Sequence, residues 1–491
     1  MRRSETDQLA FVFADSPSGS GSEEPLDVSG GKAFLLRTAK SRKIELSGAL
    51  AADMDRLLEE VASPPNLAEA LLNVARNKGA PGIDGCTVEE VVGSSRSLLF
   101  LLRRALLGGR YQPGDIRRVW IPKPGGGQRG LGIPNVMDRW VQQAVLQILE
   151  PIFDPGFHDS SHGFRRHRGA RTAVKEVKAH LRSGYRVVVD CDLSKFFDRV
   201  HHQRLLDRVG QQVRDPRILD LVRQMLKAHV VLPEGVRVST EMGAPQGGPL
   251  SPLLSNIVLD ELDWELDRRG LRFVRYADDF QVFVRSDRAG RRVMDSIRRF
   301  IEKRLRLLVN EGKSSVSRPE DVQFLGFRFV PRDGDDIEVH ISKRTKARLD
   351  SRILEMTPRN WGRSLAACLE DLNVYLRGWT GYFRLCTADG AVLFRRFDAH
   401  IRRRIRAIVV KQKKRPRHLF RHLVARGVNP RTAGATAFRR CGIWSKSNRR
   451  GLTAAYPNIW FATRLYSLWT GWHVLNAAPR KALGQALLFD L

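Results

Sequence analysis

The chain has 491 residues, of which 42% are hydrophobic, a content typical of a globular protein with room for several cores. It carries 84 Lys and Arg residues against 53 Asp and Glu residues, which gives a formal net charge of +31. This excess predicts a polyanionic partner, either a nucleic acid or a membrane surface, and the predominance of Arg favours nucleic-acid phosphates.

The cysteines and the hydrophobic runs indicate in which cellular compartment the protein works. The five cysteines are far apart and form no C-x-x-C pair, which argues against a zinc module and a disulfide framework and predicts reducing conditions. The residues after Met1 contain no apolar signal core, and no later run is long enough to span a bilayer. We therefore expect a cytoplasmic protein without a membrane partner.

The first part of the chain is rich in Ser, Gly and Asp, and residues 1–47 are predicted to be a disordered leader. Residues 48–76 have apolar residues at helical spacing and predict helices on either side of a proline pair. A Gly- and Pro-rich loop at 78–85 precedes a helix that is expected to begin near Thr87.

A hairpin is predicted at residues 117–134, where two apolar stretches flank a Gly-rich turn. Glycines let the backbone approach a ligand closely, and Lys123 and Arg129 near the tip could meet phosphates. A solvated hairpin tip with incidental positive charges is the alternative. A helix is predicted at 138–153, and the His- and Arg-rich loop at 157–173 suits phosphate contact better than metal binding.

Residues 187–189 are apolar and β-branched and predict a central strand that ends in Asp190 and Asp192. Because side chains alternate faces along a strand, both carboxylates should point the same way. Helix capping is the alternative role for Asp192. A rigid loop with several Gly and Pro residues follows at 243–252 and leaves Gln246 as its polar side chain.

Two adjacent carboxylates occupy the turn of a second predicted hairpin, at residues 272–284. Asp278 and Asp279 are like charges side by side, an arrangement that is costly in a buried hairpin unless a positive charge offsets it. A divalent metal ion is the usual solution, because hard cations take oxygen ligands. An ordinary turn with Asp-Asp at its tip is the structural alternative.

A helix is predicted at 293–309 and a strand at 324–329, so strands and helices alternate around one small sheet in an α+β architecture. Residues 343–385 are predicted to be helical. Residues 391–450 contain nineteen Lys and Arg residues against one acid, Asp398, and several Trp and Tyr residues follow. This combination suits contact with a nucleic-acid backbone and base stacking, and a basic surface over an aromatic core is the alternative.

Several motifs in sequence order resemble those of reverse transcriptases, and the whole set is most similar to group II intron-encoded reverse transcriptase/maturases. The resemblance covers roughly residues 65–475. Many relatives carry a C-terminal endonuclease with paired Cys and His residues, and no such cluster precedes Leu491, so an endonuclease-lacking form is expected. The matching segments are residues 82–85, 163–165, 192–198, 245–252, 276–279 (Tyr-Ala-Asp-Asp) and 324–327.

The resemblance implies an α+β fold of the right-hand polymerase type, with fingers, a palm that contains a small antiparallel sheet, and a thumb, followed by an α-helical maturase domain. Fingers and palm are expected at residues 48–335 and the thumb at 336–390. A basic maturase domain that binds RNA and DNA is expected at 391–491. The leader at 1–47 has no counterpart in the family.

The family also implies residue roles. Two Mg²⁺ ions would be held by three carboxylates and one main-chain carbonyl, and the family pattern selects Asp192 over Asp190. The nucleotide would be bound by two cations, a glutamine and an aromatic residue that closes the sugar pocket against a 2′-hydroxyl. The residues are Asp192, Leu193, Asp278 and Asp279 for the metals, Lys123, Arg129, Phe197 and Gln246 for the nucleotide, and Lys313 as a candidate proton donor to pyrophosphate.

The implied function is RNA-directed DNA polymerisation that copies intron RNA into cDNA for retrotransposition, joined to a maturase activity that assists splicing. The implied partners are group II intron RNA, a DNA target or primer, and deoxynucleoside triphosphates, in the bacterial cytoplasm near the nucleoid. The oligomeric state stays open. The alternatives are a maturase without polymerase activity, a reverse transcriptase adopted for CRISPR adaptation or phage defence, and a polymerase that makes RNA.

Overall fold

The computed structural model describes residues 27–40, 55–122, 126–332, 336–360, 362, 364–387 and 390–477. Contacts divide the chain into an N-terminal unit (Met1–His180 and Tyr185–Val316) and a C-terminal unit (Leu181–Gly184 and Ser317–Leu491). Each unit contains a hydrophobic core of its own. None of the helices in the described part of the chain combines the length and the hydrophobicity that crossing a membrane requires.

Part of the predicted leader is folded. The expectation of disorder over residues 1–47 is wrong for α2 (Val28–Lys40), a helix that contacts α5 (Pro64–Arg76) and α6 (Val88–Gly93). The physical reason is that α2 buries Leu35 completely in the core of the N-terminal unit, which offsets the cost of ordering a short helix. The other residues of this segment lie outside the described residues.

The predicted helix start near Thr87 is confirmed by its hydrogen bonds. The Thr87 side chain accepts from the main-chain N–H of Glu90 at 3.3 Å, and the Glu90 carboxylate accepts from the Thr87 N–H at 2.7 Å. This capping box satisfies two N–H groups at the start of α6. The helices on either side of the proline pair are α4 (Leu57–Val61) and α5, and α7 (Ser95–Leu107) follows α6.

The first predicted hairpin is formed by β1 (Ile116–Pro122) and β2 (Gln128–Ile133), which pair antiparallel. Strand β1 also pairs in parallel with the short strand β4 (Val230–Val231), and β4 pairs with β5 (Arg237–Val238). The helix α8 (Val136–Phe153) follows directly and packs against α5. Its position is fixed by the fully buried Trp140, whose indole N–H donates to the Leu67 carbonyl at 2.7 Å.

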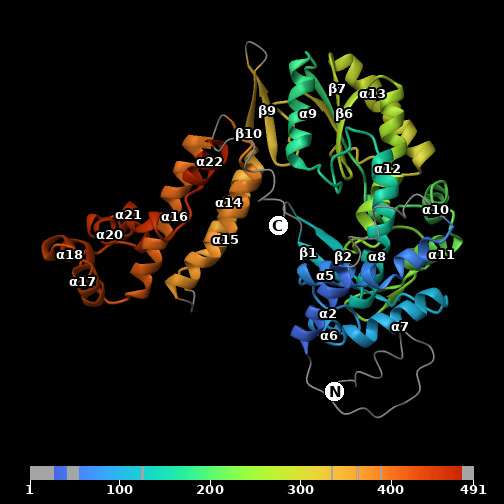
Figure 1. Cartoon of the computed structure of the whole chain (residues 1–491). Coiled ribbons are helices and arrows are strands. Elements are labelled where there is room, and N and C mark those ends of the chain that lie inside the picture. The colour runs from blue at the N-terminus through green and yellow to red at the C-terminus, as the bar shows by residue number, and fades with distance from the viewer. Residues whose placement is uncertain are drawn as a thin grey trace. The chain divides into compact units, whose positions relative to one another are not determined.

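The second sheet has the strand order β6–β7–β3–β8, with β3 and β7 in its centre. Helices α12 (Ser251–Arg268) and α13 (Asp287–Phe300) cover one side, and α9 (Ala170–Arg182) lies on the other (Figure 1). Helices α10 (His202–Gly210) and α11 (Pro216–Lys227) connect β3 to β4. The strands are β3 (Val187–Asp192), β6 (Arg272–Tyr276), β7 (Asp279–Val284) and β8 (Ser315–Ser317). The predicted central strand is confirmed as β3, and the second predicted hairpin is confirmed as β6 and β7.

The predicted helix over 293–309 is wrong in its last part. Helix α13 ends at Phe300, a π-helical turn follows at Ile301–Leu305, and Arg306 adopts a positive φ of 57°. The chain must leave the helix there because the next segment hydrogen-bonds along β3, with the Ser194 N–H donating to the Leu308 carbonyl at 2.8 Å. The apolar spacing alone could not distinguish a helix that continues to residue 309 from a segment that leaves the helix after Phe300.

The C-terminal unit begins with an antiparallel pair, β9 (Phe327–Pro331) and β10 (Ile337–Ile341). The strand predicted at 324–329 therefore starts late: Leu325 and Gly326 have positive φ and form a tight turn before Phe327. The predicted helical region is confirmed as α14 (Lys343–Met356) and α15 (Leu365–Phe383). The remaining helices are α16 (Gly390–Gln412), α17 (Pro416–Ala425), α18 (Pro430–Ala437), α19 (Ile443–Lys446), α20 (Arg450–Ala455), α21 (Asn458–Ala462) and α22 (Leu468–Ala477).

Candidate active site

Four carboxylates gather where β3 meets β7. In the antiparallel register, Asp192 lies opposite Asp279, and Asp190 lies opposite Gln281. Because side chains alternate faces along a strand, the members of these two pairs share one face of the sheet: Asp190, Asp192, Asp279 and Gln281. Asp278 lies in the turn that precedes β7. The structure thus places the three aspartates that the sequence predicts as a group at the same end of the sheet.

These carboxylates raise one another's pKa. Burial raises the pKa of Asp279 to about 8, and the charges of Asp190, Asp278 and Asp192 add to the rise. Part of Asp279 is exposed at the surface, yet protein atoms crowd its carboxylate, so loss of hydration is the first cause. Burial likewise raises the pKa of Asp190 to about 6, against the hydrogen bond from Gln281. The site therefore favours any cation that reaches it.

Asp192 is oriented by the segment that follows α13. Asn310 donates its Nδ2 to Asp192 Oδ2 at 2.9 Å and its main-chain N–H to the Asp192 carbonyl at 2.8 Å. Lys313 Nζ lies 3.4 Å from the same Oδ2, and 66% of the Lys313 side chain is exposed, so this ion pair contributes little. Leu193 lies opposite Val309 in an antiparallel bridge, which is held by hydrogen bonds of the neighbours of both residues.

A buried cation supports the Asp-Asp turn from behind. Arg275 has no exposed surface, and its Nε donates to Asp263 Oδ1 at 2.7 Å. Its Nη1 donates to the Asn256 Oδ1 and to the Ala277 carbonyl, both at 2.9 Å, and its Nη2 donates to Ser161 Oγ at 2.7 Å. Ala277 has a φ of 58°, which is strained for a residue other than glycine. One guanidinium therefore ties the strained turn to α12 and to the loop before α9.

That loop approaches the turn very closely. The His162 N–H donates to the Arg275 carbonyl at 2.9 Å, and its ring Nε2 lies 2.6 Å from Glu176 Oε2 on α9. A Cβ atom at Gly163 would lie 2.3 Å from the main-chain nitrogen of Ala277, a distance that real Cβ atoms do not adopt. Only glycine fits here, because the neighbouring atoms are backbone and cannot move aside as a side chain does.

We predict that Gly163→Ala slows nucleotide addition by roughly a hundredfold, because the added methyl group displaces the turn that carries the carboxylates. The matched control is Gly169→Ala in the same loop, where a Cβ meets no atom within 4 Å. Primer extension of both variants checks this. Equal activity of the two variants would mean that the close approach of the loop has no part in placing the turn.

The residues expected around the nucleotide are joined by backbone hydrogen bonds. The Gly132 N–H of β2 donates to the Gln246 carbonyl at 2.8 Å, and the Ala244 N–H donates to the Phe197 carbonyl at 2.7 Å. Phe197 is half-buried, with its ring 5.1 Å from that of Phe196 at a steep angle. The hairpin, the Gln246 loop and the turn after β3 therefore form one connected wall.

Arg129 projects from the exposed end of β2 and acts on the carboxylates. Burial and the charge of Asp192 raise the pKa of Asp278, while the positive charge of Arg129 lowers it in part. The charge of Arg129 thus reaches the Asp-Asp turn. An anionic substrate that contacts both Arg129 and this turn would require such proximity. Lys123 lies outside the described residues.

The donor atoms suit Mg²⁺, although they are not already assembled around one point. In the described ranges, no three His, Cys, Asp or Glu side chains stand close enough together to hold a metal ion. Mg²⁺ takes oxygen ligands and needs only one or two protein carboxylates, because it keeps water and binds substrate phosphates. The raised pKa of Asp279 indicates a repulsion that such an ion would relieve.

We predict that the metal-free protein becomes less stable as the pH rises from about 4 to about 8, the interval between the ordinary and the folded-state pKa of Asp279. The pKa of Asp279 in the folded state is about 8, above its ordinary value of 3.8, so its stabilising contribution is present at low pH and is lost as the pH rises through 8. Thermal melting in chelator should show this fall. Mg²⁺ should reverse it most at high pH, and Asp279→Asn should flatten it; an unchanged profile in Asp279→Asn would contradict the assignment.

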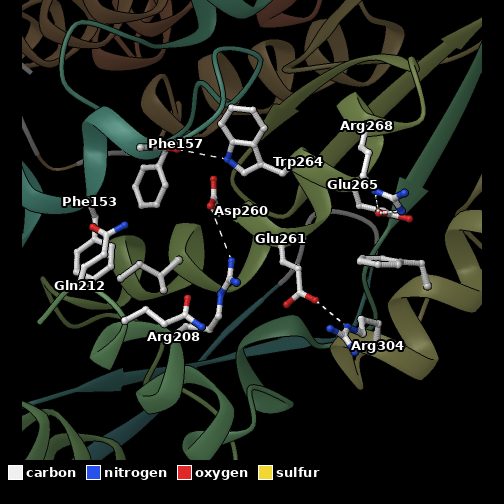
Figure 2. Close-up of a pocket in the computed structure, with 14 residues that line it drawn as sticks. Phe153, Phe157, Arg208, Gln212, Asp260, Glu261, Trp264, Glu265, Arg268 and Arg304 are labelled. Carbon is white, nitrogen blue, oxygen red and sulfur yellow. Dashed lines mark hydrogen bonds and ion pairs between the residues drawn. The ribbon is translucent and has the colours of Figure 1, made fainter.

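A cavity of about 720 Å³ lies elsewhere in the N-terminal unit, among α8, α10, α12 and α13 (Figure 2). Its charged side chains are paired with one another: Arg304 Nε lies 3.2 Å from Glu261, and Arg208 Nη2 lies 3.9 Å from Asp260. None of the three predicted metal-binding aspartates lines it. This cavity is therefore not part of the candidate active site.

The sequence analysis missed four residues that support the site. Arg275, Asn256 and Asp263 form the buried network behind the turn, and Asn310 orients Asp192. For Arg275 a signal was available, since a charged residue within an otherwise apolar strand is buried only with a partner. The two asparagines gave no signal, because their partners are distant in sequence.

Two protein-family models match parts of the chain. The family model described as reverse transcriptase (RNA-dependent DNA polymerase) matches residues 121–329, a range that contains Asp192, Asp278 and Asp279. The model described as group II intron, maturase-specific domain matches residues 346–427. A reverse transcriptase domain followed by a maturase-specific domain therefore defines the class of protein.

Two similar proteins indicate to which family within this class the chain belongs. Protein YkfC of Escherichia coli (strain K12) is 34% identical over 357 residues, which cover 64% of this chain and 91% of YkfC. The group II intron-encoded protein LtrA of Lactococcus lactis subsp. cremoris is 34% identical over 262 residues, which cover 53% of this chain and 42% of LtrA. The chain belongs to the group II intron-encoded reverse transcriptase/maturase family.

The family assignment fixes the fold as a right-hand polymerase followed by an α-helical maturase domain, with the β6–β7–β3 sheet in the palm. Among solved structures, a partial Cas6-RT-Cas1–Cas2 complex is similar with a TM-score of 0.33 and 23% identity, over 50% of this chain and 42% of that chain. A likeness this low carries no inference about function.

Proposed function

We propose that this reverse transcriptase copies intron RNA into cDNA for retrotransposition and that it binds the same RNA as a maturase to assist splicing. The observation that carries the polymerase part is the group formed by Asp192, Asp278 and Asp279 at one end of the palm sheet. The observation that supports the maturase part is the helical C-terminal unit with its strong positive charge.

In this proposal, the three carboxylates and the Leu193 carbonyl hold two Mg²⁺ ions. When bound, the ions stabilise negative charge on the attacking 3′-oxygen and on the leaving pyrophosphate. The protein's part is to hold the ligands in place: Asn310 orients Asp192, and Arg275 supports the turn that carries Asp278. Asp190 is the less suitable ligand, because it pairs with Gln281 and so lies two residues further than Asp192 from the Asp278–Asp279 end of the sheet.

Lys123 and Arg129 bind the triphosphate of the incoming nucleotide in this scheme, and Gln246 lines the site of the nucleotide and template. Arg129 suits this role because it is exposed and acts on Asp278 through its charge. Lys313 is proposed to give a proton to the departing pyrophosphate. Its ammonium group lies beside Asp192, where it is exposed and able to move.

Phe197 is proposed to exclude the 2′-hydroxyl of ribonucleotides, since that hydroxyl is the physical difference between the two substrates. We predict that Phe197→Val lowers the preference for deoxynucleotides roughly tenfold or more, because a smaller side chain opens the sugar pocket. Phe197→Tyr keeps the ring and should keep the preference. Single-nucleotide incorporation kinetics measure the ratio, and a wild-type enzyme that prefers ribonucleotides would instead indicate RNA synthesis.

Two measurements separate this function from a maturase without polymerase activity. Purified protein should make cDNA on a primed RNA template with deoxynucleotides and Mg²⁺, and it should stimulate splicing of the intron that surrounds its reading frame. If the protein makes no cDNA while Asp278→Ala splices normally, the binding-only function holds. Sequencing of RNA that purifies with the protein would show whether an intron RNA is bound and which one.

A further inference from the structure

A second cavity lies within the C-terminal unit, between α16 and the helices α19 to α21. Its volume is about 570 Å³, within the range of ordinary ligand pockets. Arg402, Arg403 and Arg406 line one side together with His400, and Trp444 and Asn448 line the other. Unlike the cavity of Figure 2, whose cations are paired with acids, this one has no acidic residue in its lining.

The acids nearest to this part of α16 lie outside the lining of the cavity. Asp398 accepts hydrogen bonds from the main-chain N–H groups of Leu468 and Trp469 and from the Ser467 hydroxyl, at 2.9, 3.2 and 2.7 Å. The charge of Asp398 acts on Arg402 and the charge of Asp350 acts on His400, so the cationic lining is compensated in part, from outside the cavity. Burial, and then the charge of Arg402, lowers the pKa of Arg406 to about 10, as expected where positive charges are crowded.

Two donors in the cavity wall lack partners. His400 Nε2 and Arg403 Nε are buried, and neither makes a hydrogen bond within the part of the chain that the structure describes. An anion in the cavity would place its charge beside Arg402.

The cavity is also preorganised. The Arg403 guanidinium carbon lies 4.0 Å from the centre of the Trp444 ring, and Nη2 donates to the Trp444 carbonyl at 3.1 Å. Arg406 Nη2 donates to the Tyr456 carbonyl at 2.8 Å. Side chains that are already fixed lose little conformational entropy when a ligand arrives.

From these observations we infer that the cavity binds a backbone phosphate of RNA, with the adjacent nucleotide in the remaining volume. RNA is favoured because His400 and the three arginines lie within residues 346–427, the segment that matches the maturase-specific domain. The neutral side chains of Asn448, Thr453 and Asn458 complete the lining and can meet a 2′-hydroxyl or a base edge. This inference rests on the proposed maturase function and assigns it a site.

The test measures binding of the full-length protein to a labelled single-stranded RNA of mixed sequence, without Mg²⁺ or nucleotides. The double variant His400→Ala/Arg402→Gln should lose about tenfold in affinity, as expected when charged hydrogen bonds are removed. The slope of log affinity against log salt should fall by about 0.7, the value for one phosphate contact on a single strand. The matched control, Arg417→Gln, removes one charge from the exposed face of α17.

Loss of affinity in the double variant well beyond that of Arg417→Gln supports the site. Equal losses would assign the effect to net charge alone and would overturn it, as would an unchanged affinity. Thermal melting checks the fold of each variant, and the single variant Arg402→Gln at the half-exposed rim serves if the double variant is unstable.

A photo-crosslinking RNA, digested and mapped by mass spectrometry, should attach to Trp444 or its neighbours. Attachment only outside α16 and α19 to α21 would contradict the proposal. Competition by single-stranded DNA as strong as by RNA would overturn the assignment to RNA, as would competition by a phosphopeptide. Because these measurements need no polymerisation, a wild-type protein that makes no cDNA would disprove the polymerase function and leave this site intact.

Discussion

An Asp278→Asn variant should retain about one thousandth or less of the wild-type rate of cDNA synthesis. The substitution keeps the shape of the side chain and removes the charge that binds the metal ions, and loss of electrostatic stabilisation of this kind costs on the order of a thousandfold. The fold should survive, because Asp278 adds to the repulsion that raises the pKa of Asp279 in the metal-free protein. Its melting temperature in chelator should equal or exceed that of the wild type.

Primer extension under single-turnover conditions checks this rate, and RNA binding is measured beside it. Binding should be unchanged, because the basic C-terminal unit does not depend on Asp278. Asp220→Asn is the matched control, an aspartate on α11 that pairs with Arg223 at the surface. Wild-type activity in Asp278→Asn would show that the turn carries no catalytic group.

The second large effect is expected for Arg275→Met, which removes the buried cation behind the turn. Asp263 would be left charged and fully buried, and breaking a buried ion pair in this way costs about 3–5 kcal/mol. The Ala277 carbonyl would also lose the donor that supports its strained conformation. We therefore expect a lower melting temperature and a loss of cDNA synthesis.

A double variant separates stability from positioning. Arg275→Met/Asp263→Leu removes both charges, and replacing a buried pair with apolar residues is often neutral for stability. Stability should recover, whereas cDNA synthesis should stay low and the Mg²⁺ concentration for half-maximal rate should stay raised, because no donor reaches the Ala277 carbonyl. Recovery of both properties together would mean that Arg275 acts only through the stability of the fold.

The positions of the candidate carboxylates could be predicted from sequence because their signals are local. Val187 to Val189 read as a buried strand, so the alternation that follows placed Asp190 and Asp192 on one face. The hairpin around Asp278 had the same kind of periodicity. The register that sets Asp192 opposite Asp279 is not local and was not predicted; the resemblance to a family implied only that Asp192 acts together with Asp278 and Asp279.

The supporting residues could not be predicted because their contacts are long-range. Arg275 reaches Ser161 across 114 positions, and Asn310 reaches Asp192 across 118. No pattern within a short window encodes such a pair. The need for glycine at Gly163 likewise comes from a backbone that is distant in sequence, the Ala277 turn.

The errors in the predicted elements have a similar origin. Composition predicted disorder over residues 28–40, but tertiary burial of Leu35 stabilises α2. Helical spacing continued beyond Phe300, but pairing along β3 draws the chain out of the helix. In both cases a contact with another part of the chain outweighed the local preference.

The central claim is that this chain places an RNA-templated, metal-dependent polymerase site on the β3–β7 end of its palm. The most direct test is primer extension by the purified full-length chain on an RNA template. We predict full-length cDNA with deoxynucleotides and Mg²⁺, and none in chelator or with Asp278→Asn. Absence of cDNA from folded, RNA-binding wild-type protein, or synthesis that Asp278→Asn leaves unchanged, would contradict the claim.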